Sequence, residues 1–313
     1  MPHVRRRRDE IFQNSKLSSF RIVHYTSAES ALKIIKSKRL WMRSAACMSD
    51  YREVQHGHDM LLKYFNDQGN YKAFTEAVDV VAPGAAIRAI ANFDKYWNSG
   101  TILYQTYISS VSEHQDIEDL DGRLSMWRAY GGNSAHVALV FHCPAQSDGA
   151  EAMKLIFSPI TYLETEEANL LIPEIIGEIQ ANYELLKSIE NQVISNWIFN
   201  MLLTIVTCVK HSGFREEREW RVVYCPNLFH SEFIKPTTET ISGVPQVVYN
   251  LPLDKTLNAS LEDLDFTKLF DRVIIGPTQY AMPITNAFLA ELKMAGVPEA
   301  QKKILISHIP IRS

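Results

Sequence analysis

RIVHYTSAESALKIIKSKRLW, residues 21–41, is the stretch of sequence that decides the fold. It predicts a short strand that ends in the polar triplet His24-Tyr25-Thr26 and then a helix with regularly spaced apolar residues. Thr26 and Glu29 have the spacing of a capping box, which predicts that the helix starts at Thr26. A polar triplet at a helix N-terminus lies beside free backbone N–H donors and the positive end of the helix dipole. The stretch therefore suits an anionic ligand such as the pyrophosphate of a dinucleotide.

The composition is that of an ordinary globular protein. The chain has 313 residues, of which 46% are hydrophobic and 22% charged, and a formal net charge of −4. This charge argues against a nucleic-acid footprint over the whole chain, but it leaves room for a local basic cleft. The four cysteines have no CxxC spacing, which favours free thiols and a cytoplasmic protein.

The order of the predicted elements indicates an α+β protein. Strands cluster in the middle and in the C-terminal third, and a large helical insertion is expected at about residues 165–210. Within it, Val193–Val209 is predicted to be a buried core helix and not a membrane span, because it is short and contains polar residues. Residues 1–18, with the basic run Arg5–Arg8, are expected to form a flexible arm. Residues 19–313 are expected to form a single domain.

Glu217 and Glu219 are the second informative feature. If this segment is a strand, Glu217, Glu219 and Arg221 lie on one face, because side chains alternate along a strand. Two neighbouring carboxylates can have displaced pKa values, which suits acid–base or electrostatic catalysis. The alternative is a surface ion pair between Glu219 and Arg221 on an edge strand, and the spacing leaves both interpretations open.

Several motifs follow one another along residues 20–280. They are His24-Tyr25-Thr26-Ser27, Ser49-Asp50-Tyr51-Arg52-Glu53, Ser125-Met126-Trp127-Arg128-Ala129-Tyr130-Gly131, Phe214-Arg215-Glu216-Glu217-Arg218-Glu219-Trp220-Arg221 and Ile274-Ile275-Gly276-Pro277. In this order they resemble the ADP-ribosyltransferase fold and, within it, a widespread bacterial family of uncharacterised proteins (DUF2971-like). The resemblance implies a mixed β-sheet core with a helical insertion.

The resemblance also implies residue roles in splitting the bond between nicotinamide and ribose in NAD⁺. Glu219 would stabilise the positive charge of the transition state, and Glu217 would orient the incoming nucleophile. The triplet His24-Tyr25-Thr26 would bind NAD, with His24 hydrogen-bonded to a ribose hydroxyl. Tyr25 or Tyr130 would stack on the nicotinamide ring. Ser110 would support the cleft from a strand that resembles a Ser-Thr-Ser strand, although an ordinary strand end is an equal alternative.

Three functions stay open from the sequence. The first is an NAD-dependent ADP-ribosyltransferase, a bacterial toxin or anti-phage effector that modifies a macromolecule, with mRNA favoured over protein as acceptor and an antitoxin as a further partner. The second is an NAD glycohydrolase that depletes NAD, and the third is a non-enzymatic binding module on a degenerate transferase fold. NAD is expected as a substrate and no metal is expected. The sequence also lacks the Rossmann, P-loop, zincin and α/β-hydrolase motifs.

Overall fold

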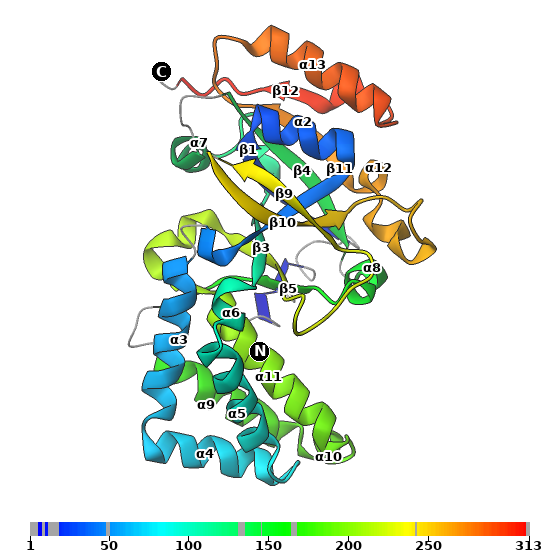
Figure 1. Cartoon of the computed structure of the whole chain (residues 1–313). Helices are drawn as coiled ribbons and strands as arrows, with labels where there is room; N and C mark the ends of the chain where they lie inside the picture. The colour runs from blue at the N-terminus through cyan, green and yellow to red at the C-terminus, as the bar shows by residue number, and fades with distance from the viewer. Residues whose placement is uncertain are drawn as a thin grey trace.

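The computed structural model describes residues 6–7, 10–11, 19–47, 51–130, 135–144, 146–163, 168–241 and 243–310. Figure 1 shows a twisted sheet in the upper half of the molecule and a cluster of helices below it. The sheet is mixed, and helices and strands both contribute to the core, as the sequence predicts.

In the described part of the chain, the main sheet has ten strands. Eight form a continuous order, in which neighbours are antiparallel except for the parallel pair β11–β12. That order is β12 (Ile304–Ile306), β11 (Phe270–Ile275), β4 (His136–Pro144), β1 (Ser19–Ser27), β3 (Tyr107–Glu113), β2 (Arg39–Ser44), β10 (Val244–Pro252) and β9 (Lys235–Ile241). The other two are β8 (Glu219–Tyr224), which pairs with β3, and β5 (Ile156–Pro159), which pairs with β8.

The sheet divides at β3. One end of β3 pairs with β1 through Ser112 and Glu113, and its other end pairs with β2 through Tyr107 and Ile108. Residues 109–111 lie between these two pairings, while the β8 pairing extends along β3 from Tyr107 to Ser112. The divergence of β1 and β2 opens a gap in the sheet beside the middle of β3.

The helix that connects β1 to β2 begins one residue later than the capping-box spacing predicts. Helix α2 covers Ala28–Ser37, and its N-cap is Ser27, whose hydroxyl accepts a hydrogen bond from the Ser30 N–H at 3.1 Å. The predicted start at Thr26 is wrong because Thr26 is still paired with Val137 in the β1–β4 ladder. A β-branched residue fits that strand better than a cap.

Helices α2 and α13 (Ala281–Met294) pack together and cover one face of the sheet. The core beneath them contains buried apolar residues from β4, β11 and both helices. Shorter helices surround the sheet: α7 (Leu124–Tyr130), α8 (Asp148–Ala152) and α12 (Phe266–Leu269).

The lower cluster of helices has its own hydrophobic core. It combines α9 (Ala168–Ala181), α10 (Tyr183–Lys187) and α11 (Asn191–Thr207) with α3 (Tyr51–Phe65), α4 (Gln68–Asp79), α5 (Ala85–Asn98) and α6 (Thr101–Tyr104). Helix α11 is the predicted buried helix, and it packs against both α3 and α5. Residues 51–104 and 168–207, which are far apart in the sequence, therefore build one helical layer. In the described chain, no helix is long and apolar enough to cross a membrane.

A small parallel pair of strands joins this layer to the sheet. Strand β6 (Thr161–Leu163) continues from β5, and β7 (Val209–His211) follows α11. Strand β7 leads into the 3₁₀ helix η3 (Ser212–Glu217), which ends just before β8. The helical layer and the start of β8 are therefore close in both sequence and space.

Candidate functional site

A cleft of about 690 Å³ lies where β1 and β2 diverge. Its walls include the end of β1, the first turn of α2 and the middle of β3. The residues that line it include His24, Tyr25, Thr26, Ser27, Ser30, Lys33, Trp41, Arg43, Ser110 and His136. The cleft therefore contains the predicted polar triplet and lies beside the N-terminus of α2.

His24 is fixed by the strand on the other side of the cleft. Its Nδ1 lies 3.0 Å from the backbone carbonyl of Ser110. Burial lowers the pKa of His24, and the hydrogen bond to Ser110 offsets this only in part. The neutral imidazole therefore donates from Nδ1, because a carbonyl only accepts, and Nε2 becomes the acceptor of the ring. Such a nitrogen can accept a hydrogen bond from a hydroxyl group.

Tyr25 is a buried wall of the cleft, with 5% of its surface exposed. Its ring packs edge-on against Trp127 with the centroids 4.9 Å apart. Its hydroxyl accepts a hydrogen bond from the backbone N–H of Arg123 at 2.9 Å. Burial raises the pKa of Tyr25 to about 12, so the phenol is neutral at physiological pH. Tyr130 is the last residue of α7, and its side chain lies outside the described part of the structure.

Tyr25 and Ser110 also line a second, much smaller cavity, whose wall includes Glu217 and Glu219. These two residues thus border both the cleft and the space beside the glutamates. The structure therefore brings together the N-terminal triplet and the distant glutamates, which are separated by almost two hundred residues of sequence.

Glu219 is the first residue of β8 and is 5% exposed. Its carboxylate accepts hydrogen bonds from Arg221 Nε at 2.8 Å and from Lys210 Nζ at 3.2 Å. Its backbone N–H donates to the Tyr162 hydroxyl at 2.8 Å. The carboxylate and the backbone of Glu219 are thus both held in place.

The predicted strand does not extend to Glu217. Glu217 ends η3, and Arg218 has a left-handed conformation with φ of 46° before β8 begins. The alternation that predicted one shared face thus applies to Glu219 and Arg221 but not to Glu217. Glu217 still lies beside Glu219, because Lys210 Nζ contacts both carboxylates, that of Glu217 at 2.8 Å.

The two glutamates have pKa values displaced in opposite directions. Burial alone would raise the pKa of Glu219, but the charges of Arg221 and Lys210 lower it overall. Burial also raises the pKa of Glu217, and the hydrogen bond from Lys210 does not offset burial and the repulsion from Glu219 and Glu53. Glu219 is therefore an ionised carboxylate, and Glu217 takes up a proton more readily than an ordinary glutamate.

The ion pair between Glu219 and Arg221 is formed, but it is not on the surface. Both side chains are buried, and β8 lies between β3 and β5 instead of at an edge of the sheet. Burying an ion pair has a high desolvation cost, which weakens the case for stability as its purpose. The interpretation as a surface pair on an edge strand is therefore wrong.

Three charged residues of the site were not predicted from the sequence as site residues. Glu53 of α3 accepts from Lys210 at 3.1 Å and from Arg221, and Arg221 Nη1 also donates to the Thr207 carbonyl at 2.7 Å. Glu53 and Arg221 belong to motifs noted in the sequence, but no pattern singled out Lys210. Glu53 and Thr207 belong to the helical layer, and through them this layer positions Lys210 and Arg221, the two side chains that bind the Glu219 carboxylate.

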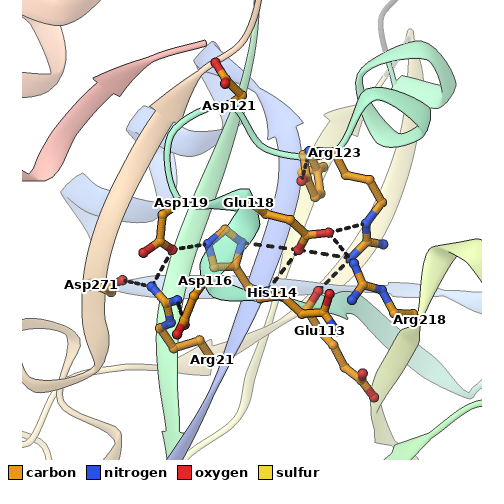
Figure 2. Close-up of polar contacts among 12 residues, drawn as sticks. Arg21, Glu113, His114, Asp116, Glu118, Asp119, Asp121, Arg123, Arg218 and Asp271 are labelled. Atoms are coloured by element: carbon orange, nitrogen blue, oxygen red, sulfur yellow. Dashed lines mark hydrogen bonds and ion pairs between the residues drawn. The ribbon is translucent and has the colours of Figure 1, made fainter. Parts of the chain in front are cut away.

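Arg123 also fixes the turn before β8, through hydrogen bonds to backbone carbonyls. Its Nη1 donates to the carbonyls of Glu216 and Glu217 at 2.9 and 3.0 Å, and its Nη2 donates to the Glu113 carbonyl at 2.8 Å. Figure 2 shows that Arg123 and Arg218 converge on the carboxylate of Glu118. This network links the turn to β3 and, through the Arg123 backbone, to Tyr25.

The described residues contain no group of three or more His, Cys, Asp or Glu side chains placed to hold a metal ion. Three carboxylates, those of Glu53, Glu217 and Glu219, instead contact two cations, Lys210 and Arg221, so one negative charge is left over when all three are ionised. The arrangement can therefore stabilise a positive charge that develops next to Glu219.

Comparison with known proteins matches part of the chain to a family model. No curated protein and no solved structure matches the chain. Residues 126–222 match the model of a family described as "Protein of unknown function (DUF2971)". The matched segment includes Glu217, Glu219 and Arg221 but not His24. By this match, the chain resembles the DUF2971 family over the part that carries the two glutamates.

Proposed function

We propose that the chain is an NAD-dependent ADP-ribosyltransferase. The observation that carries the proposal is that Tyr25 and Ser110 border both the cleft of His24 and the cavity of Glu217 and Glu219. A dinucleotide in the cleft would have its nicotinamide ribose at this junction. The division of the mixed sheet at β3 also supports the proposal, because the cleft forms between strands β1 and β2 of the sheet itself.

The cleft has suitable groups for each part of the substrate. The positive end of α2, with Lys33 and Arg43 on the walls, suits the pyrophosphate. The Nε2 atom of His24 would accept a hydrogen bond from a ribose hydroxyl. Tyr25 would contribute an apolar wall for the nicotinamide ring instead of a free stacking platform, since its own ring packs against Trp127.

In the proposed reaction, the bond between the nicotinamide nitrogen and the ribose C1′ breaks, and the electron pair leaves with a now neutral nicotinamide. The ribose becomes positively charged, and the ionised Glu219 stabilises that charge. The acceptor nucleophile forms the new bond to C1′. Glu217, whose pKa is raised, would take the proton that the acceptor loses.

The acceptor we propose is a macromolecule, with nucleic acid such as mRNA favoured over protein. The setting we propose is a bacterial toxin or anti-phage effector, with an antitoxin as partner. This part of the proposal rests on the resemblance of the motifs to ADP-ribosyltransferases.

Transfer of a label from NAD tests the proposal. The full chain is incubated with NAD labelled in its adenylate part and with RNA, DNA and protein from cells. Label on a macromolecule is the expected result, whereas free ADP-ribose identifies an NAD glycohydrolase. Intact NAD would contradict both activities and leave a binding module. Glu184→Gln, at an exposed position on α10, is the matched control for variants of Glu219.

A further inference from the structure

A second pocket, of about 550 Å³, reaches Glu219 from a different side. The described residues that line this pocket and those that line the small cavity beside the cleft have one member in common, Glu219. Glu219 therefore borders both spaces. A group-transfer enzyme needs such an arrangement, because donor and acceptor must approach the same reacting atom from different directions.

Four arginines and three glutamates (Glu10, Glu113 and Glu219) are the charged residues that line the second pocket in the described part of the chain. Arg6 and Arg7 from the N-terminal arm line it together with Arg215 and Arg218 from the turn before β8. Three of them already have carboxylate partners: Arg6 pairs with Glu174, Arg7 with Glu113 and Arg218 with Glu118. The Arg6 side chain is nevertheless 64% exposed, and that of Arg7 is 42% exposed.

Arg215 differs from the other three. It is exposed on η3, and no described residue makes a hydrogen bond or an ion pair with its guanidinium. An arginine fork without a partner is suited to two parallel hydrogen bonds with a phosphate. Arg215 and Glu219 line the same pocket, so an anion bound at Arg215 would lie in the space that Glu219 borders.

The neighbouring groups favour a single strand of nucleic acid. Phe214, which precedes Arg215, has 46% of its surface exposed, and Lys210 Nζ lies 4.6 Å from its ring centroid. Phe214 is next to Arg215 in the chain but does not itself line the pocket, whereas Tyr162 and Thr161 do. An exposed aromatic ring next to arginines is one way in which proteins bind single strands, since a base stacks on the ring and the phosphates meet the cations. An acidic peptide would use the arginines but would not need the ring.

We propose that this second pocket is the acceptor site and that it binds the phosphate backbone of single-stranded nucleic acid through Arg215. The identification of this pocket as the acceptor site rests on the proposed function. The binding itself does not depend on NAD. A failure of NAD cleavage is therefore distinguishable from a failure of this inference.

Fluorescence anisotropy with a short fluorescein-labelled single-stranded RNA of mixed sequence, without NAD, tests the inference. The full chain is compared with Arg215→Glu and with Arg88→Glu, which makes the same charge change at an exposed position on α5. Arg215→Glu should weaken binding about tenfold or more and should reduce the salt dependence of binding, whereas Arg88→Glu should change binding less than about twofold.

Three results would overturn the inference. They are the absence of RNA binding by the parent chain, equal weakening by the two variants, and binding of a labelled poly-glutamate peptide as tight as that of the RNA. The last result would assign the pocket to an acidic protein segment. Both substitutions replace exposed side chains, so the two variants should unfold at the same urea concentration as the parent chain.

Discussion

The guanidinium of Arg123 donates a hydrogen bond to the backbone carbonyl of Glu217 at 3.0 Å. The backbone N–H of the same arginine donates to the Tyr25 hydroxyl, so one residue connects the wall of the cleft with the turn before β8. This connection fixes the position of Glu217 and Glu219 relative to the N-terminal triplet.

Arg123→Lys should loosen the turn before β8. An ammonium group cannot reach the carbonyls of Glu113, Glu216 and Glu217 together with Glu118, because it lacks the planar fork of arginine. Buried acceptors then lose their donors, and the free energy of unfolding should fall by about 2 to 4 kcal/mol. Urea unfolding measures the loss, and amide exchange at residues 216–219 should become faster. Arg128→Lys, at an exposed position on α7, should change neither.

If amide exchange at residues 216–219 is the same in Arg123→Lys and in the parent chain, Arg123 does not position the turn.

Glu219→Asp should separate the catalytic role of Glu219 from its structural role. Aspartate keeps the negative charge for Lys210 and Arg221 but withdraws the carboxylate from the cavity by one methylene. NAD cleavage should fall by about a hundredfold to a thousandfold, the usual cost of losing a stabilising group at a developing charge. Activity is measured as release of nicotinamide.

Glu219→Gln should lose activity as well, but it should also destabilise the chain by about 3 to 5 kcal/mol, because it removes a buried carboxylate from Lys210 and Arg221, which then keep only Glu53 and Glu217 as partners. The unfolding free energy of both variants is measured beside activity. Full nicotinamide release by folded Glu219→Asp and Glu219→Gln would show that Glu219 is not the carboxylate that supports catalysis.

His24→Asn and His24→Gln should have opposite effects. The amide of asparagine takes the place of Nδ1 and keeps the donor to the Ser110 carbonyl, whereas the amide of glutamine takes the place of Nε2. His24→Asn should keep the stability of the parent chain and bind NAD about tenfold more weakly, as expected for one lost hydrogen bond. His24→Gln should retain more of the NAD affinity and lose about 1 kcal/mol of stability.

Calorimetric titration with NAD and urea unfolding give the two quantities for each His24 variant. Equal NAD affinity in His24→Asn and in the parent chain would exclude a contact between Nε2 and the ribose.

Asp271→Asn should reduce stability at neutral pH and have less effect as the pH falls. Burial alone would raise the pKa of Asp271, but hydrogen bonds from His142, Arg272 and Arg21 lower it well below its ordinary value. A carboxylate with a lowered pKa in the folded state stabilises the fold above its unfolded pKa of about 3.9, and that stabilisation is lost as the pH falls further.

The difference in unfolding free energy between parent and Asp271→Asn should therefore be about 2 kcal/mol near neutral pH and should shrink below about pH 4. Urea unfolding at a series of pH values measures it. A difference that stays constant down to about pH 3 would show that the ion pairs of Asp271 do not contribute through its charge.

The sequence alone determined the features that depend on local spacing. Alternation along a strand predicted that Glu219 and Arg221 share a face, and the two side chains form an ion pair. Short length and polar interruptions predicted that α11 is a buried core helix and not a membrane span. Strand-forming residues followed by a helical pattern predicted the order of β1 and α2, although the helix cap is Ser27 and not Thr26. Each of these properties is set by neighbours within a few residues.

Only the tertiary structure decided which side chains surround Glu219. Glu53 and Lys210 come from different elements, and no local pattern relates either of them to β8. The place of β8 inside the sheet, which buries the ion pair that one interpretation of the sequence placed on the surface, depends on pairing with β3 and β5. The physical reason is that strand pairing and ion pairing join residues far apart in the chain, where periodicity carries no information. Local sequence thus specified the groups, and long-range packing determined their charge environment.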